Sequence, residues 1–216
     1  MIPIILRLKK VNNREIAKAQ DIMMQSLYEV FKNAIFHGGT CIWRCYNGNR
    51  FSEDIDVYIP RDINKINQFF EILKKKGLII EKKKISEKSI FSTFKFNRTL
   101  VKFEAVFKET RGHLKDYETA EGNFLTVYSL NEEELIIEKS LTYLKRFRIR
   151  DLYDVYFLLR YLDDISKVKK YLIELLTKFK SPIDEKDLKV VILEGIVPTT
   201  SQMLDYIRGK LKNGKN

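Results

Sequence analysis

The sequence has few cysteines, which form the disulfide bonds of small secreted domains, and few histidines, which together with cysteines bind zinc. It has two cysteines, Cys41 and Cys45, and two histidines in 216 residues. The cysteines are four positions apart, so in a helix they share one face, where helical geometry disfavours a disulfide between them. The histidines are too few to complete a zinc site. We therefore expect free thiols, mostly buried, in a reducing cell.

Long apolar runs and a secretion signal are also missing. No apolar stretch reaches about 18 residues, the length that indicates a membrane-spanning helix. The first ten residues hold an apolar segment too short for a signal peptide, and their charges follow that segment instead of preceding it. These absences predict a cytoplasmic protein with no membrane partner.

The remaining composition is that of a folded globular chain. Hydrophobic residues make up 44% of the sequence, which argues against intrinsic disorder. A chain of 216 residues forms one large domain or two small ones and can bury a substantial core. No internal repeat or low-complexity segment is present.

Basic residues outnumber acidic ones. Forty lysines and arginines against 29 aspartates and glutamates give a formal net charge of +11. Such a charge favours a polyanionic partner such as nucleic acid. Many lysines fall in runs, at 74–76 and 82–84, so a solvated lysine-rich surface explains the charge equally well.

Hydrophobic periodicity divides the chain into a mixed first part and a helical second part. Apolar spacing predicts helices near 14–32 and 63–76, and period-two patterns predict strands near 34–37, 54–57, 78–80, 91–97, 100–108 and 124–128. From Asn131 onward the period is helical, with three acids in the first turn of the first helix. We expect an α+β fold, with domains 1–130 and 131–216 and an active-site cleft between them.

One stretch carries chemistry: His37-Gly38-Gly39-Thr40, followed by Phe51-Ser52-Glu53-Asp54-Ile55-Asp56-Val57. Asp54 and Asp56 are two residues apart, so in a strand both point to one side, with Cα atoms roughly 6.6 Å apart. Carboxylates at that spacing can share divalent ions. Glycines let the backbone approach a phosphate, and the following helix N-terminus favours an anion. Thr40 is expected to cap that helix and to contact phosphate.

Each of these residues also has a plainer interpretation. Two acids on a strand could pair with lysines, and a lone histidine such as His37 is more often packed than catalytic. Arg50 could meet a triphosphate or be an exposed loop arginine. Ser52 could contact phosphate through its hydroxyl.

The combined pattern resembles a known family. The glycine turn, its spacer and Asp-x-Asp are similar to nucleotidyltransferases of the DNA polymerase beta superfamily. The longer string resembles the AbiEii/AbiGii (MenT-like) toxins of type IV toxin–antitoxin systems. Two later stretches fit the same branch, the strand at 101–104 and the run from Glu138-Lys139 to Arg150-Asp151-Leu152-Tyr153-Asp154. The resemblance covers about residues 30–160.

The resemblance implies a polymerase-beta-type core, a mixed sheet flanked by helices, followed by an all-helical part that closes the cleft. It implies Glu104 as third metal-site carboxylate beside Asp54 and Asp56, although the family more usually has aspartate there. The alternative for Glu104 is an edge-strand salt bridge with Lys102 or Lys95.

In the helical part the resemblance implies that Lys139 contacts nucleotide phosphate and that Asp151 is the essential helical acid. Alternatively Lys139 is solvated, and Asp151 is an N-cap or fixes Lys139 by an ion pair. Arg146 is a candidate for the triphosphate or for RNA, as is Arg150. Asp154 is interpreted as structural.

The function implied is transfer of NMP from an NTP to an RNA acceptor, first of all the 3′ end of tRNA, with release of pyrophosphate. The resemblance and the oxygen-only ligands imply Mg²⁺ or Mn²⁺ as cofactor, and the family implies a separate antitoxin protein. The alternatives are nucleotidylation of a protein or small molecule, and a catalytically weak nucleotide- or RNA-binding module of the same fold.

Overall fold

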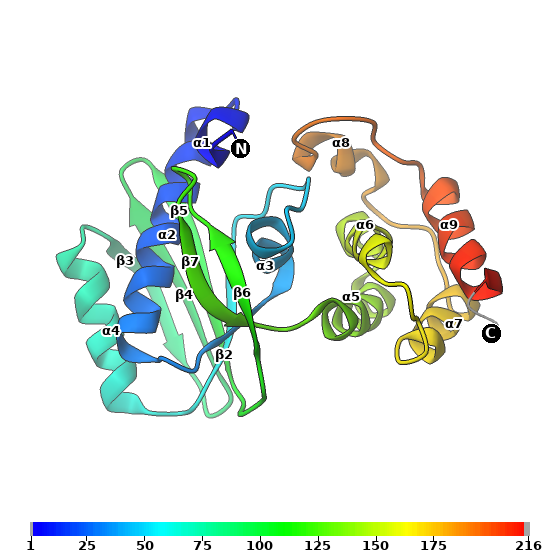
Figure 1. Cartoon of the computed structure of the whole chain (residues 1–216). Helices are drawn as coiled ribbons and strands as arrows, with labels where there is room; N and C mark the ends of the chain where they lie inside the picture. Colours follow the sequence, from blue (N-terminus) through cyan, green and yellow to red (C-terminus); the bar gives the residue numbers. More distant parts are fainter. Residues whose placement is uncertain (1, 214–216) are drawn as a thin grey trace. The chain divides into compact units, whose positions relative to one another are not determined.

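The computed structural model describes residues 2–213. These residues form two compact units (Figure 1). The sheet unit comprises residues 2–47 and 51–130. The helical unit comprises residues 48–50 and 131–213, so a three-residue segment from early in the chain belongs to it.

A seven-stranded mixed sheet forms the centre of the sheet unit. The strands follow the order β3-β4-β5-β2-β1-β7-β6. The pairs β1–β7 and β2–β5 are parallel, and the other neighbouring pairs are antiparallel. The strands are β1 Ile35–His37, β2 Ile55–Ile59, β3 Ile79–Ile85, β4 Ser89–Phe96, β5 Thr99–Phe107, β6 His113–Glu118 and β7 Phe124–Ser129. The mixed sheet confirms the expected α+β class.

Helices of the sheet unit supply the second layer of its core. They are α1 Ile4–Arg7, α2 Val11–Val30, α3 Gly38–Cys45 and α4 Ile63–Lys75. Helices α2 and α4 lie against the sheet (Figure 1). The ring of Phe69 on α4 packs 4.8 Å from that of Phe103 on β5. Burial of each such side chain contributes about 1.5–3 kcal/mol.

The sequence predicts some of the helices and strands of the sheet unit. The predicted helices at 14–32 and 63–76 correspond to α2 and α4. The strand predicted at 78–80 extends to residue 85, and two strands occupy 113–129 where only 124–128 was clear. Helix α1 has four residues, too few for a periodic pattern to predict it.

The helical unit begins where the sequence changes period. Its helices are α5 Glu132–Arg146, α6 Ile149–Leu158, α7 Lys169–Thr177, α8 Leu188–Val191 and α9 Thr200–Asn213, with 3₁₀ turns at Leu159–Tyr161 and Glu185–Asp187. Asn131 and Glu134 form a capping box at the start of α5. Phe147 adopts a left-handed conformation (φ 50°) and ends α5, so α6 starts in a new direction.

The segment Gly48–Arg50 is held in the helical unit by its backbone. The carbonyl of Asn49 accepts a hydrogen bond from the amide of Leu193 at 3.0 Å. Arg50 forms an isolated antiparallel bridge with Ile192. The loop that leads from α3 towards Asp54 therefore passes through the helical unit before it returns to the sheet.

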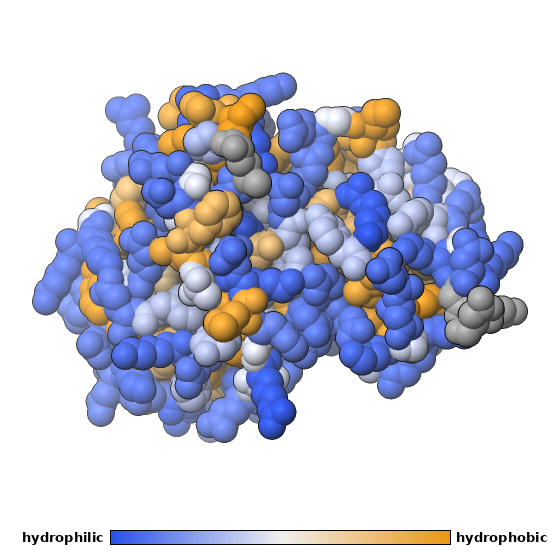
Figure 2. Space-filling model, in the orientation of Figure 1, coloured by the Kyte–Doolittle hydropathy of each residue, from blue (hydrophilic) through white to orange (hydrophobic). Residues whose placement is uncertain are grey.

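The surface fits the basic, polar composition. Figure 2 shows a mostly hydrophilic face with scattered apolar patches. Cys41 is buried and Cys45 half-buried, and both are free thiols, as expected. Over residues 2–213, no helix has the length and apolarity needed to cross a membrane.

Candidate active site

Asp54 and Asp56 lie at the start of β2. Both acids were expected within the strand. The strand begins at Ile55, so Asp54 directly precedes it and only Asp56 lies within it. The expected alternation holds nonetheless, since Ile55 and Val57 are fully buried whereas Asp54 and Asp56 are half-buried. The apolar residues anchor the strand in the core, and the acids remain accessible.

Asp56 is the middle of a row of polar side chains that crosses the sheet. Its register partners are His37 on β1 and Glu104 on β5. In-register residues of paired strands share a face and stand about 4.8 Å apart. The fold therefore brings Asp56 and Glu104 together from positions 48 residues apart in the sequence.

Glu104 does not lie on an edge strand, as its interpretation as an edge-strand salt bridge requires. Strand β5 lies between β4 and β2, in the interior of the sheet. One of the two lysines suggested as partner of Glu104 lies close to Asp54, with Lys102 Nζ 3.5 Å from Asp54 Oδ1. A lysine beside Asp54 compensates its charge in this structure.

The first glycine of the turn lies directly against the Asp56 carboxylate. Gly38 has φ +77°, a conformation that residues with a Cβ rarely adopt. A Cβ built on Gly38 would lie 2.2 Å from Asp56 Oδ2. Gly38 is thus required both by its own backbone and by the carboxylate next to it.

Thr40 has a different structural role from the one predicted. The N-cap of α3 is His37, and Thr40 is the third residue of the helix, so it does not cap it. Thr40 is fully buried, and its hydroxyl donates a 2.5 Å hydrogen bond to the backbone carbonyl of Asp54. This short hydrogen bond therefore joins the glycine turn to residues 51–54, which we call the acidic loop.

A second support of the acidic loop was not predicted from the sequence. Gln20 on α2 is fully buried. Its side-chain amide donates to the carbonyls of Ser52 at 2.9 Å and Glu53 at 3.1 Å. Gln20 falls within the apolar stripe of α2. A polar residue in such a stripe indicates a buried group that needs a hydrogen-bond partner, and this is the signal by which the sequence could have pointed to Gln20.

These residues offer oxygen ligands for a hard cation. No group of three His, Cys, Asp or Glu side chains in residues 2–213 is arranged to hold a metal ion, so the expected set Asp54, Asp56 and Glu104 does not form a ready-made cage. Mg²⁺ is usually held by one or two carboxylates together with substrate phosphates. The acids at the start of β2, with Gly38 packed closely against one of them, fit that mode of binding.

A second cluster of charges lies inside the helical unit. Arg50 and Asp154 form a bidentate pair, with Nε–Oδ1 and Nη2–Oδ2 both 2.8 Å. Arg146 and Asp151 form another, with both distances 2.7 Å. Lys139 joins the two pairs, since its Nζ is 3.1 Å from Asp154 Oδ2 and 3.8 Å from Asp151 Oδ1.

Apart from Arg146, whose side chain is 40% exposed, this cluster is buried, and it carries one more cation than anions. The side chains of Asp151 and Asp154 are 0% and 1% exposed. Burial opposes ionisation of Asp154, but the charges of Arg50 and Lys139 outweigh it and hold the pKa of Asp154 below its usual range. The ammonium of Lys139, whose side chain is buried (7% exposed), is thereby held at a fixed position.

Several plainer interpretations of these residues are wrong. Arg50 is 5% exposed and therefore not an exposed loop arginine, and Lys139 is 6% exposed and therefore not a solvated helix lysine. The N-cap of α6 is Arg148, so Asp151 is not that cap. Asp151 instead contacts Lys139 and Arg146, which agrees with the ion-pair alternative.

The fold thus groups the predicted site residues into two sets. Those of the sheet unit are Gly38, Gly39, Thr40, Ser52, Asp54, Asp56 and Glu104. Those of the helical unit are Arg50, Lys139, Arg146 and Asp151. Asp154, which was interpreted as structural, belongs to the second set and contacts both Arg50 and Lys139.

Solved structures with this fold are known. The chain is similar to JHP933 from Helicobacter pylori, with 16% identity, coverage of 95% of this chain and 94% of that one, and a TM-score of 0.66. It is similar to the nucleotidyltransferase toxin MenT4 from Mycobacterium tuberculosis, with 17% identity, coverage of 96% and 86%, and a TM-score of 0.67. A comparison with curated proteins gives no match.

The family model of the nucleotidyl transferase AbiEii toxin, type IV toxin–antitoxin system, matches residues 21–194. The match includes Asp54, Asp56 and Glu104 of the sheet unit and the charged cluster of the helical unit. The fold agrees with it, since the similar structures cover nearly the whole chain. The protein is thus a nucleotidyltransferase and belongs to the AbiEii toxin family of type IV toxin–antitoxin systems.

Proposed function

We propose that the protein transfers NMP from an NTP to an RNA acceptor, the 3′ end of tRNA being the first candidate, and releases pyrophosphate. The observation that carries the proposal is the close packing of Gly38 against the carboxylate of Asp56. A phosphate-approaching turn and an acid that can hold a cation meet there, as transfer at an α-phosphate requires.

The triphosphate would be held first by the glycine turn. The amides of Gly38, Gly39 and Thr40 begin helix α3, and helix N-termini attract phosphate. The hydroxyl of Ser52 is a further candidate contact. In the helical unit, Lys139, Arg146 and Arg50 are the candidate cations for nucleotide phosphate, with Asp151 and Asp154 holding them in place.

Asp54 and Asp56 would hold Mg²⁺ or Mn²⁺, with Glu104 as an additional ligand on the neighbouring strand. When bound, the cation supplies charge stabilisation at the α-phosphate and at the departing pyrophosphate. Lys102, 3.5 Å from Asp54, compensates the charge of that acid in its absence. We expect Lys102 to move away when the cation binds.

The chemical step is an in-line displacement. A hydroxyl oxygen of the acceptor forms a bond to the α-phosphorus, and the bond from that phosphorus to the oxygen bridging the β-phosphate breaks. Glu104 is the candidate to accept the hydroxyl proton, because it lies in register with Asp56 on the same face of the sheet. The electron pair leaves with pyrophosphate.

The type IV family implies a separate antitoxin as partner. We propose a cytoplasmic location, where NTP and RNA are both available. Both units would serve one reaction, to which the helical unit would supply Lys139 and Asp151.

A catalytically weak module that binds nucleotide or RNA is the second candidate. It is favoured by the finding that no three acids among residues 2–213 form a ready-made metal site. Such a module would bind RNA in a salt-sensitive manner whether or not Asp54 is intact.

The two candidates separate in one experiment. Purified protein is incubated with each α-³²P-labelled NTP, Mg²⁺ and total cellular RNA, and the products are resolved on a denaturing gel. A labelled tRNA-sized band, absent with Asp54→Asn, supports transfer to tRNA and names the base. Label in a protein band redirects the proposal to protein nucleotidylation. No label with any NTP, from folded protein that binds Mg²⁺, favours the binding module.

A further inference from the structure

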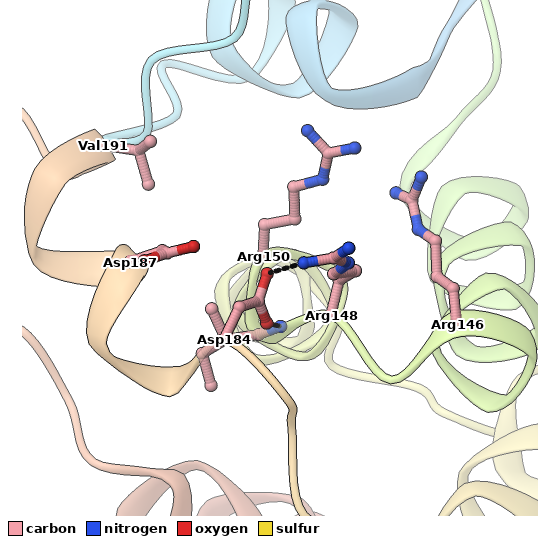
Figure 3. Close-up of a pocket in the computed structure, with 7 residues that line it drawn as sticks. Arg146, Arg148, Arg150, Asp184, Asp187 and Val191 are labelled. Atoms are coloured by element: carbon pink, nitrogen blue, oxygen red, sulfur yellow. Dashed lines mark hydrogen bonds and ion pairs between the residues drawn. The ribbon is translucent and has the colours of Figure 1, made fainter.

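A cavity of about 500 Å³ opens in the helical unit beside the charged cluster. Three arginines at alternate positions line it, Arg146, Arg148 and Arg150, and two acids lie opposite, Asp184 and Asp187 (Figure 3). The volume falls within the range of roughly 300–1,000 Å³ that is usual for ligand pockets. All lining residues belong to the helical unit.

Two of the three arginines already have acidic partners. Arg146 is paired with Asp151, which does not line the cavity, and the side chain of Arg146 is 40% exposed. Arg148 lies 3.4 Å from Asp184, the pair marked by a dashed line in Figure 3. Asp184 also accepts a 2.7 Å hydrogen bond from the amide of Ile149, at the start of α6, so its carboxylate is fully engaged.

Arg150 is different. Its side chain is exposed and makes no hydrogen bond or ion pair with any residue in the described range 2–213. Its guanidinium extends away from the Arg148–Asp184 pair in Figure 3. A planar fork of donors with no protein partner, at the edge of a cavity, is suited to a phosphate oxygen.

We propose that this cavity, the arginine pocket, binds one nucleotide of the RNA acceptor through its backbone phosphate. The inference rests on the proposed function and names where its second substrate binds. Arg150 contacts the phosphate, and Arg146 lies next to it. Through Asp151, Arg146 connects the pocket to Lys139, the cation proposed for the NTP.

The lining favours an RNA nucleotide over the triphosphate of an NTP. A triphosphate concentrates several negative charges, which the carboxylates of Asp184 and Asp187 would repel. A single phosphodiester carries one charge, which Arg150 neutralises. Asp187 can accept a hydrogen bond from a ribose 2′-hydroxyl, and Val191 provides apolar surface for the sugar or base.

Arg150→Gln tests the assignment, with Arg208→Gln as matched control. Arg208 is an arginine of the same unit, 53% exposed, and pairs with Asp205 on α9 away from the pocket. Both variants remove one exposed charge. Binding of a fluorescein-labelled 12-nucleotide single-stranded RNA is measured by anisotropy at several salt concentrations, and binding of each NTP by equilibrium dialysis.

We expect Arg150→Gln to weaken RNA binding roughly tenfold. The slope of log K against log salt should become shallower by about 0.7, the value for one phosphate contact on a single strand. NTP binding should not change, and Arg208→Gln should resemble the unchanged protein in both assays.

Two results would overturn the proposal. In one, Arg150→Gln and Arg208→Gln have equal effects on RNA binding. In the other, Arg150→Gln weakens NTP binding and leaves RNA binding intact, which would assign the pocket to the triphosphate. The binding assay needs no turnover, so RNA binding that depends on Arg150, without any label transfer, would refute the proposed function alone.

Discussion

The guanidinium of Arg50 and the carboxylate of Asp154 face each other in a buried bidentate pair, with both N–O distances 2.8 Å. Arg50 comes four residues before Asp54 in the sequence, yet it belongs to the helical unit. Asp154 also contacts Lys139, at 3.1 Å. One carboxylate on α6 therefore positions two basic residues that lie 89 positions apart in the sequence.

Removing one partner of this pair should be costly. Asp154→Ala leaves Arg50 and Lys139 buried with an uncompensated charge, which costs about 3–5 kcal/mol of unfolding free energy. Urea denaturation followed by circular dichroism measures the loss. Asp205→Ala, at an exposed acid on α9, is the control and should change stability by less than about 0.5 kcal/mol. Equal stability of the two variants would show that the buried pair is dispensable.

Acid should weaken the same pair. Burial opposes the charge of Asp154, but Arg50 and Lys139 outweigh it and lower its pKa in the folded protein. Its contribution is therefore complete above the unfolded pKa of about 3.9 and is lost as pH falls from there through the folded value. We expect Asp154→Asn to lose less stability than the unchanged protein between about pH 5 and pH 3, as read from thermal melting.

Asp21 provides a control, because its pKa is shifted in the opposite direction from that of Asp154. Burial raises the pKa of Asp21, although Arg44 and hydrogen bonds from Ala120 and Tyr117 partly offset that effect. Its charge therefore destabilises the fold at neutral pH, and this cost is relieved as pH falls through the raised pKa. Asp21→Asn should make stability fall more steeply with acid, the reverse of Asp154→Asn. Parallel pH profiles for the two variants would contradict both assignments.

Gly38→Ala should slow nucleotidyl transfer roughly a hundredfold, because it displaces the Asp56 carboxylate without removing a charge. The added methyl would lie 2.2 Å from Asp56 Oδ2, so the carboxylate must move. A displacement of about 1 Å at a catalytic group can cost roughly a hundredfold in rate. The measurement is label transfer from α-³²P-labelled NTP.

Gly77→Ala is the matched control for Gly38→Ala. Gly77 also has positive φ, +89°, but a Cβ there would meet no atom within 4 Å. It should lose about 1–2 kcal/mol of stability from backbone strain and retain activity. If both variants lose activity equally, the contact between Gly38 and Asp56 is not the cause.

Thr40 should act on the acidic loop through its hydroxyl. Thr40→Val removes the hydrogen bond from the buried Thr40 hydroxyl to the Asp54 carbonyl. We expect the transfer rate to fall roughly tenfold, whereas Thr40→Ser, which keeps the hydroxyl, retains most of it. Loss of activity in Thr40→Ser would instead indicate that the methyl group matters for packing.

Local patterns predicted the elements that depend on nearby residues. The start of a helix after Asn131, with three acids in its first turn, and the alternation of Ile55, Asp56 and Val57 are encoded within a few positions. The order of acids and glycines also predicted the family, because its motif is compact in sequence.

Contacts that depend on tertiary packing were not predictable from local patterns. No spacing rule shows that Arg50 would cross to Asp154 or that Gln20 would hold the carbonyl of Ser52. Arg44 is another case, since its fully buried guanidinium bonds Asp21, 23 residues away. Each of these contacts satisfies a buried polar group with a partner from a different element, and only the fold determines that partner.

We propose that Asp54 and Asp56 serve transfer of the α-phosphoryl group together with its nucleoside. Parallel reactions with α-³²P- and γ-³²P-labelled NTP, Mg²⁺ and total cellular RNA test it most directly. We expect α-label to enter RNA, γ-label to be released as pyrophosphate, and both events to cease with Asp54→Asn or Asp56→Asn. Transfer of γ-label to the acceptor, or full transfer of α-label by the Asp54→Asn, Asp56→Asn double variant, would contradict it.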